Sequence, residues 1–209
     1  MPRRSTMVPM RTDAPVPIDS RALGTLTYIR ASIESASSLA VPGMAGIVMG
    51  SIGLLAAALA SIPAFAARWL EIWLLAAVAA LLLGGALMAR QAAQHGQTRY
   101  LGPARRFLLC LCPALLAGAA LTSVMWQAGT TQLIPGTWLM LYGCAVLSAS
   151  TVTAAVTMRL IATMGALFVL LGLLAFQLPL TSNALVLGAG FGVLHILFGI
   201  RMGRASRGD

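Results

Sequence analysis

Four polar residues lie in apolar segments of the chain, where they could do chemistry inside a membrane. His195 is the one titratable side chain of GAGFGVLHILFGI, and Tyr142, Ser148 and Thr151 belong to another apolar segment, residues 134–157. An ionisable group in such a segment is costly unless it faces the interior of a helix bundle. We therefore expect these residues to form an intramembrane polar site. Two interpretations of His195 stay open: a group that responds to protons or a ligand, and a neutral imidazole that hydrogen-bonds a neighbouring helix, for instance a serine or threonine of 134–157.

The other reactive side chains do not make a catalytic or metal-binding set. Glu71 lies three residues from Arg68, a spacing that favours an ion pair at the membrane surface over a transport carboxylate. His95 falls in a polar loop. The sequence has no Ser/His/Asp set, metal-ligand cluster or phosphate-binding loop. We predict no catalytic residue, no metal and no cofactor, and a protein that is not an enzyme. The three cysteines are expected to be small apolar packing residues: Cys110, Cys112 and Cys144.

The elements that position these residues follow from composition. The chain has 209 residues, of which 59% are hydrophobic and 9% charged, whereas about 25% of a soluble domain is charged. About 20 apolar residues cross a bilayer as a helix. The sequence therefore predicts an all-α, polytopic membrane helix bundle with six transmembrane helices. The expected spans cover residues 42–62, 69–89, 107–126, 134–157, 160–180 and 183–200.

The segments outside the bundle are polar. Residues 1–20 are rich in Pro, Arg, Ser and Thr and are expected to be a disordered basic tail. Residues 21–41 place Leu23, Leu26, Ile29 and Ile33 on one helical face, which predicts an amphipathic helix beside the membrane, before the transmembrane domain of residues 42–201. Residues 202–209 form a basic cytoplasmic tail in this interpretation.

The arginines predict the orientation of the bundle. All 14 basic residues are arginines, and with the N-terminus inside, all except Arg68 fall on the inner side of the predicted spans. This distribution predicts a bacterial inner-membrane protein with both termini in the cytoplasm. Because the arginines lie in separate loops rather than one patch, nucleic acid is excluded as a partner. The four tryptophans fall at the outer ends of spans, where indoles favour the interface: Trp69, Trp73, Trp126 and Trp138.

Glycines recur on two predicted spans and mark helix-packing seams. Small residues let membrane helices approach closely, and the glycines of the first span lie three or four residues apart. In the last span, His195 falls at helical spacing between glycines, so we expect it on the glycine face, pointing into protein. These faces are expected to bind partner membrane helices or a second copy of the chain. The seam residues are Gly43, Gly46, Gly50, Gly53, Gly188, Gly192 and Gly199.

A weaker pattern suggests an internal repeat. Gly43 follows Pro42 at the start of the first span, and Gly136 follows Pro135 at the start of the fourth. A shift of the same length places the second span on the fifth. Two three-helix halves of opposite topology would form an inverted repeat, as in many transporters.

Several runs together resemble a group of uncharacterised bacterial six-span integral membrane proteins. The runs are YIRASIESASSLAVPGMAG, LGPARRFLLCLCPALLAGAALT, IPGTWLMLYG and GAGFGVLHILFGI. The resemblance covers most of the chain after residue 20 and implies a six-span inner-membrane protein. It carries no catalytic or binding residue over to this chain.

Two functional classes fit these observations. The favoured one is a membrane interaction or regulatory component that works through its glycine seams and amphipathic helix. The alternative is a small transporter or channel with a path lined by His195 and the hydroxyls of the fourth span. A transporter would be expected to carry more intramembrane charge or clearly broken helices.

Overall fold

The computed structural model describes residues 24–29, 42–94, 101–153 and 155–205. The chain divides into two units, Met1–Ala36 and Ser37–Asp209. The described part of the first unit is a short helix over residues 24–29, on which Leu26 and Tyr28 are exposed. The rest of the expected amphipathic helix, the N-terminal tail and His95 lie outside the described residues.

The second unit is a bundle of helices, and in its described residues six helical segments are long and apolar enough to cross a bilayer. This confirms the predicted all-α membrane bundle. The long helices are α2 (Gly43–Ser61), α3 (Trp69–Gln94), α4 (Leu101–Gln127), α5 (Ile134–Ser150) and α6 (Ala155–Ala175). The last span runs through α7 (Asn183–Leu187), the π-helical η5 (Gly188–Leu194) and α8 (His195–Ala205). Short 3-10 turns connect the helices: η1 (Pro63–Arg68), η3 (Thr131–Leu133) and η4 (Leu180–Ser182).

The fourth span is shorter than the predicted 134–157, because α5 ends at Ser150. The hydroxyls of Ser150, Thr151 and Thr153 each donate to the main-chain carbonyl three residues earlier, at 2.7 to 2.8 Å. Such local bonds compete with regular helix and favour turns. The hydroxyl-rich end of the segment therefore forms the connection to α6 rather than the end of a longer helix.

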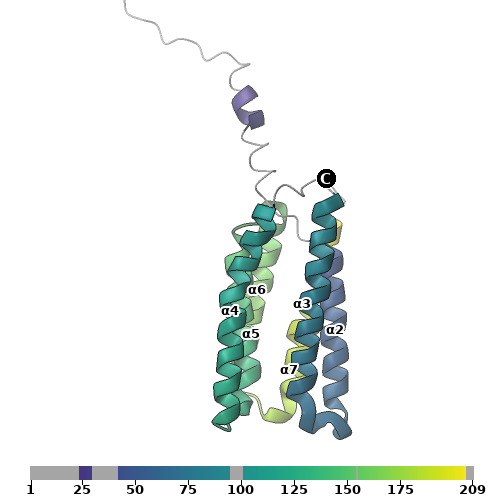
Figure 1. Ribbon diagram of the computed structural model, residues 1–209, viewed down its shortest axis with the longest axis vertical. Helices are drawn as coiled ribbons and strands as arrows, with labels where there is room; N and C mark the ends of the chain where they lie inside the picture. Colours follow the sequence, from purple (N-terminus) through teal and green to yellow (C-terminus); the bar gives the residue numbers. More distant parts are fainter. Residues whose placement is uncertain (1–23, 30–41, 95–100, 154, 206–209) are drawn as a thin grey trace, which may run out of the picture. The chain divides into compact units, whose positions relative to one another are not determined.

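The helices of the bundle associate in two groups of three (Figure 1). In one group, α2 packs against α3 and along α7, η5 and α8. In the other, α5 packs against both α4 and α6, and contacts between α6 and α8 help to join the groups. We call these the α2 group (α2, α3, α7, η5 and α8) and the α5 group (α4, α5 and α6).

In each group, neighbouring helices approach each other so closely at glycines that their backbones are in contact. In the α2 group, a Cβ added to Gly50 would lie 2.6 Å from the carbonyl oxygen of Gly192, and one added to Gly199 would lie 2.7 Å from that of Gly43. In the α5 group, Gly143 on α5 meets Gly165 on α6 in the same way. The predicted seam of α2 is therefore filled within the chain, by η5 and α8.

The helix pairing is compatible with two halves of opposite topology, but the glycines are not equivalent. α2 lies between α3 and α8, as α5 lies between α6 and α4. The shift that places Gly43 on Gly136 also places Gly50 on Gly143, and α3 on α6. Gly50 packs against Gly192 and Ile196 of the last span, whereas Gly143 packs against Gly165 and Val169 of α6. The glycine pattern that suggested the repeat therefore does not describe equivalent contacts.

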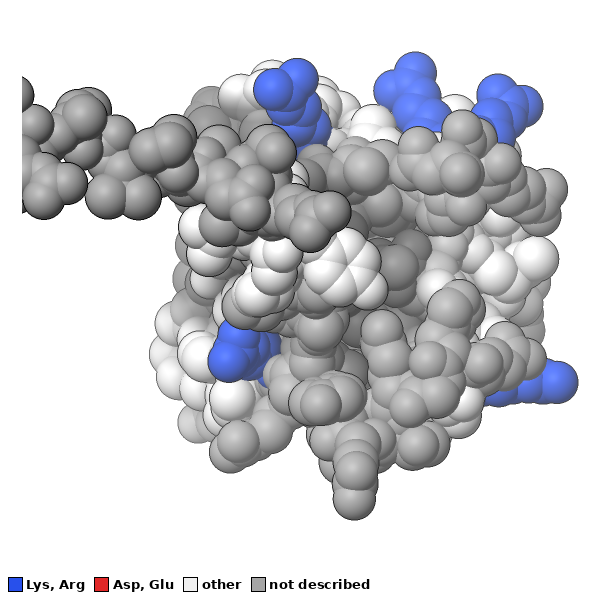
Figure 2. All heavy atoms as spheres, turned by 90° about the horizontal axis from the view of Figure 1, so that it is seen from above, with Lys and Arg blue, Asp and Glu red and all other residues white. Residues whose placement is uncertain are grey.

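The described arginines gather at one end of the bundle. Arg90, Arg159 and Arg204 lie on the parts of α3, α6 and α8 that meet at this end, whereas Arg68 lies at the opposite end, where η1 joins α3. Figure 2 looks down on this end and shows arginine side chains on it. The single acidic residue of the described part, Glu71, lies near the other end.

Candidate intramembrane ligand site

The structure brings His195 and Tyr142 together in the interior of the bundle. The Tyr142 hydroxyl lies 2.7 Å from His195 Nε2, and His195 is 4% exposed. The predicted interior position of the histidine is confirmed, but its partner is the tyrosine rather than a serine or threonine. Ser148 and Thr151 are exposed, and the Thr151 hydroxyl is bonded to the Ser148 carbonyl. Of the four residues expected in one site, two therefore form it.

His195 begins α8, directly after the π-helical η5 and four residues before Gly199. Its main-chain oxygen and Gly199 both lie against Gly46 of α2. The imidazole itself contacts Tyr142 on α5 and Phe168 on α6. The side chain therefore points into the protein and connects the helix that carries the glycines to α5 and α6.

Aromatic rings surround the hydrogen-bonded pair and connect the two helix groups. The Tyr142 ring lies edge-on to Phe168 at 4.8 Å and to Phe191 at 5.2 Å between centroids. Phe191 is also stacked at 6.2 Å on His195 and lies 6.1 Å from Trp73 on α3. Sequence analysis missed Phe168, Phe191 and Trp73 as parts of this site. Only the position of Phe191, four residues before His195, could have suggested its role.

The two ring nitrogens of His195 have different surroundings. Nε2 lies 2.7 Å from the Tyr142 hydroxyl, whereas Nδ1 is buried and has no hydrogen-bond partner among the described residues. Which atom of the Tyr142–His195 pair donates the proton depends on the tautomer of the imidazole.

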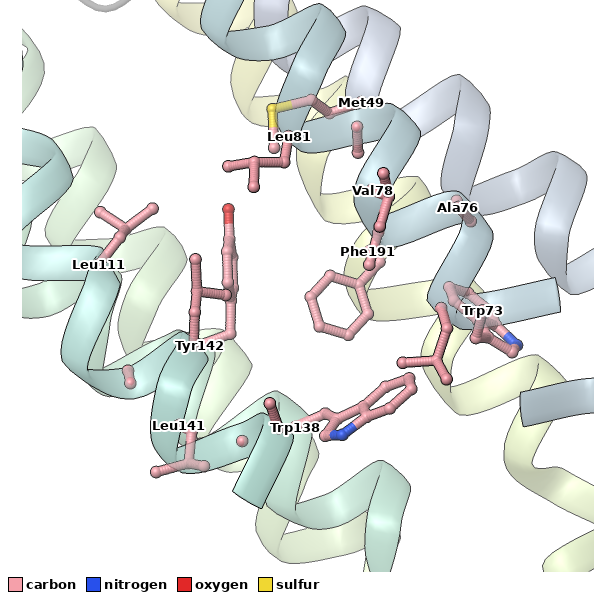
Figure 3. Close-up of a pocket in the computed structure, with 18 of the residues that line it drawn as sticks. Met49, Trp73, Ala76, Val78, Leu81, Leu111, Trp138, Leu141, Tyr142 and Phe191 are labelled. Atoms are coloured by element: carbon pink, nitrogen blue, oxygen red, sulfur yellow. The ribbon is translucent and has the colours of Figure 1, made fainter. Parts of the chain in front are cut away.

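A cavity of about 440 Å³ opens beside this pair (Figure 3). Its walls come from α2 and α3 on one side and from α4 and α5 on the other, with Phe191 and His195 between them. The lining is almost entirely apolar, and Figure 3 shows the rings of Tyr142, Phe191 and Trp138 bordering the open space. The volume is in the range of ligand pockets.

The side of the cavity between α3 and α4 is open toward the surface of the bundle. On α3, the lining residues Leu74, Val78 and Leu81 are 45%, 56% and 51% exposed, and Leu115 on α4 is 43% exposed. In a bilayer this surface faces lipid. On this side the cavity is therefore accessible from the hydrocarbon region.

The polar groups near the tryptophan end of the cavity are mostly paired with each other. The buried Thr122 hydroxyl donates to the Gly118 carbonyl at 2.6 Å and accepts from Trp138 Nε1 at 2.7 Å. Trp73 Nε1 is buried and has no hydrogen-bond partner among the described residues, and in Figure 3 it points away from the open space.

Trp73 and Trp138 also correct the expectation of an interfacial tryptophan belt. Trp73 is 3% exposed and Trp138 is half-buried, and both line the cavity. Trp126 is 55% exposed, in agreement with an interfacial position. Trp73 and Trp138 therefore line the cavity because they lie on the inward-facing sides of their helices. The position of a tryptophan along a span does not reveal which side of the helix it occupies.

The remaining candidates lie apart from this site. Arg68 and Glu71 are both exposed and form no ion pair with each other in the described part of the chain. Cys112 and Cys144 are exposed free thiols, whereas Cys110 is half-buried, so the expectation of small apolar packing residues is not met at Cys112 and Cys144. Among the residues that the structure describes, no group of His, Cys, Asp and Glu could hold a metal ion.

Comparison with known proteins adds no assignment to this geometry: no family model, curated protein or solved structure matches the chain.

Proposed function

We propose that the protein is an interaction or regulatory component of a bacterial inner membrane that binds an apolar molecule from the bilayer. The cavity between the two helix groups is the observation that carries this proposal. It combines a volume of about 440 Å³ with an apolar lining and exposed leucines at its mouth. A ligand there would contact both groups at once, so binding would favour one arrangement of the groups over others.

The proposed orientation places both termini in the cytoplasm. The arginine-bearing end of the bundle would then be the cytoplasmic end, in accordance with the positive-inside rule. The resemblance to bacterial six-span proteins supports the same location. Because the α2 seam is filled by η5 and α8, partner helices or a second copy would have to bind another surface.

Quenching of tryptophan fluorescence tests the binding proposal. The full chain, with Trp69→Phe and Trp126→Phe to remove the indoles outside the cavity, is placed in dioleoylphosphatidylcholine nanodiscs and titrated with 1,2-dibromododecane. We expect saturable quenching, because Trp73 and Trp138 line the cavity. Quenching that rises only in proportion to the quencher would indicate simple partition into the bilayer and would contradict the proposal.

A pair of adjacent alanines on α4 supplies the matched control. Ala119 lines the cavity and Ala120 does not, although both are exposed. Ala119→Phe places a ring in the open space and is expected to weaken saturable quenching, whereas Ala120→Phe adds the same ring on the lipid side and is expected to leave it unchanged. Equal effects of the two substitutions would also contradict the proposal.

A small transporter or channel is the second candidate, supported by the hydrogen-bonded pair of half-buried Tyr142 and buried His195. Polar residues at this depth often mark substrate or proton pathways. The test is proton or solute flux in reconstituted vesicles, with His195→Ala and His195→Gln as variants. A flux above that of empty vesicles that both substitutions reduce would favour transport. Flux equal to that of empty vesicles would exclude a transport function.

A further inference from the structure

The aromatic rings at one end of the cavity point to a chemical class for its ligand: we propose that the ligand is a lipid with a flat aromatic ring and an alkyl chain. The ring lies beside Phe191 and Trp138, and the chain runs toward Leu81. This inference rests on the proposed function, because it concerns the same cavity. It goes further by stating which part of the ligand the protein recognises and where that part lies.

Aromatic side chains gather at this end of the cavity from distant parts of the chain. Aromatic residues make up 6% of the sequence, but four of them line the cavity: Trp73 on α3, Trp138 and Tyr142 on α5, and Phe191 on η5. Trp73 is buried, whereas the other three are half-buried. Figure 3 shows the rings of these three at the border of the open space. The ring surface that the protein leaves uncovered can therefore contact a ligand.

Contacts within the protein hold these three rings in place. Trp138 Nε1 donates to the Thr122 hydroxyl at 2.7 Å, and the Tyr142 hydroxyl lies 2.7 Å from His195 Nε2. Phe191 packs on the Tyr142 ring at 5.2 Å between centroids. Side chains that are ordered before binding lose little conformational freedom when a ligand arrives. Because their polar atoms are already paired, what these side chains offer is the surface of a ring.

Such a surface distinguishes a flat aromatic ring from saturated hydrocarbon. The face of an aromatic ring is partly negative and its edge partly positive, so two rings attract each other beyond the effect of the buried area. Tyr142 and Phe191 already use this arrangement, since their planes lie edge to face at 65°. A saturated ring buries a similar area but lacks the attraction. An aromatic ring is therefore the group that this end of the cavity binds best.

The opposite end of the cavity is aliphatic and opens to lipid. Leu81 lies eight residues after Trp73 on α3, which is about 12 Å along the axis at 1.5 Å per residue. Figure 3 shows Leu81 and Met49 at this end, away from Trp138. Val78 and Leu81 are both exposed between α3 and α4. An alkyl chain attached to the ring fills this end and leaves the cavity toward the bilayer.

Displacement of the quencher by two matched probes tests the proposal. Dodecylbenzene and dodecylcyclohexane have the same carbon skeleton and differ in whether the ring is aromatic. Each is used to displace 1,2-dibromododecane from the protein with Trp69→Phe and Trp126→Phe, in the same nanodiscs. Probe concentrations are expressed as mole fractions of the bilayer, which removes differences in partition from water.

The expected result is a preference for the aromatic probe. An aromatic contact is worth about 2- to 12-fold in affinity beyond area burial, so the displacement midpoint for dodecylbenzene is expected to be lower than that for dodecylcyclohexane by this factor. Equal midpoints for the two probes overturn the proposal. This comparison needs no further variant, so it decides the question even if the variants described next do not fold.

Two phenylalanines of the last span locate the preference in the cavity. Phe191→Leu removes a ring that lines the cavity and is expected to bring the two midpoints together. Phe198→Leu removes a buried ring of α8 that does not line the cavity, and it is expected to keep their ratio. A ratio that Phe191→Leu leaves unchanged, or that both substitutions reduce equally, also overturns the proposal.

Failure of this inference can be distinguished from failure of the proposed function. If quenching is saturable and the two probes have equal midpoints, the cavity binds apolar molecules without recognising an aromatic ring. If quenching does not saturate in the starting protein, the proposed binding function fails and this inference fails with it.

Discussion

Gly50→Ala tests how strongly the α2 seam holds the bundle. The added Cβ would lie 2.6 Å from the Gly192 carbonyl oxygen and from Ile196 Cγ1, whereas ordinary contact begins at 3.4 Å. The Ile196 side chain can rotate, but the carbonyl belongs to the backbone of η5. The helices must therefore separate by about 0.8 Å, the difference between these distances. Overpacking of this kind typically costs about 1–3 kcal/mol.

The matched control is Gly85→Ala on α3, where an added Cβ meets no atom within 4 Å. Both substitutions gain about 1 kcal/mol of helix propensity, so their difference isolates the steric cost at Gly50. The free energy of unfolding is measured by SDS titration in mixed micelles, followed by circular dichroism. We expect Gly50→Ala to be less stable than Gly85→Ala by about 1–3 kcal/mol.

Equal stability of the two variants would refute the reasoning. It would mean that α2 and η5 are not in backbone contact, and that the seam is free for another helix. A change in oligomeric state on Gly50→Ala, without a change in stability, would point to the same conclusion. The predicted partner helix would then bind at the glycine face itself.

Three further predictions follow from the site and from the orientation. Tyr142→Phe removes the partner of buried His195 Nε2 and is expected to lower the free energy of unfolding by about 1–3 kcal/mol, measured by the same titration. Thr122→Val leaves the Trp138 indole N–H without its acceptor, so we expect a change in the tryptophan emission maximum that Ser123→Ala, next to it on the helix, does not cause. A reporter enzyme that is active only in the cytoplasm, fused after Asp209, should be active, and an inactive fusion would reverse the proposed orientation.

The candidate site was only partly predictable from sequence. The burial of His195 follows from the cost of an ionisable group in lipid, which any fold of this chain must avoid. Tyr142 was among the expected residues, but Ser148 is exposed on α5 itself, and Thr151 is exposed beyond the end of α5, where the chain turns toward α6. The spacing of residues in one segment shows which of them share a helical face, but it does not show which face of that helix a neighbouring helix covers.

By itself, the sequence determined that six apolar segments alternate with polar connections and that the arginines gather on one side, because length and hydropathy are properties of each segment alone. Only the tertiary structure decided that α2 packs along η5 and α8, that His195 meets Tyr142 of α5, and that Trp73 and Trp138 line a cavity. These features depend on the rotation of each helix about its axis and on its neighbours. Both are set by backbone contacts between glycines far apart in the chain, such as Gly43 and Gly199.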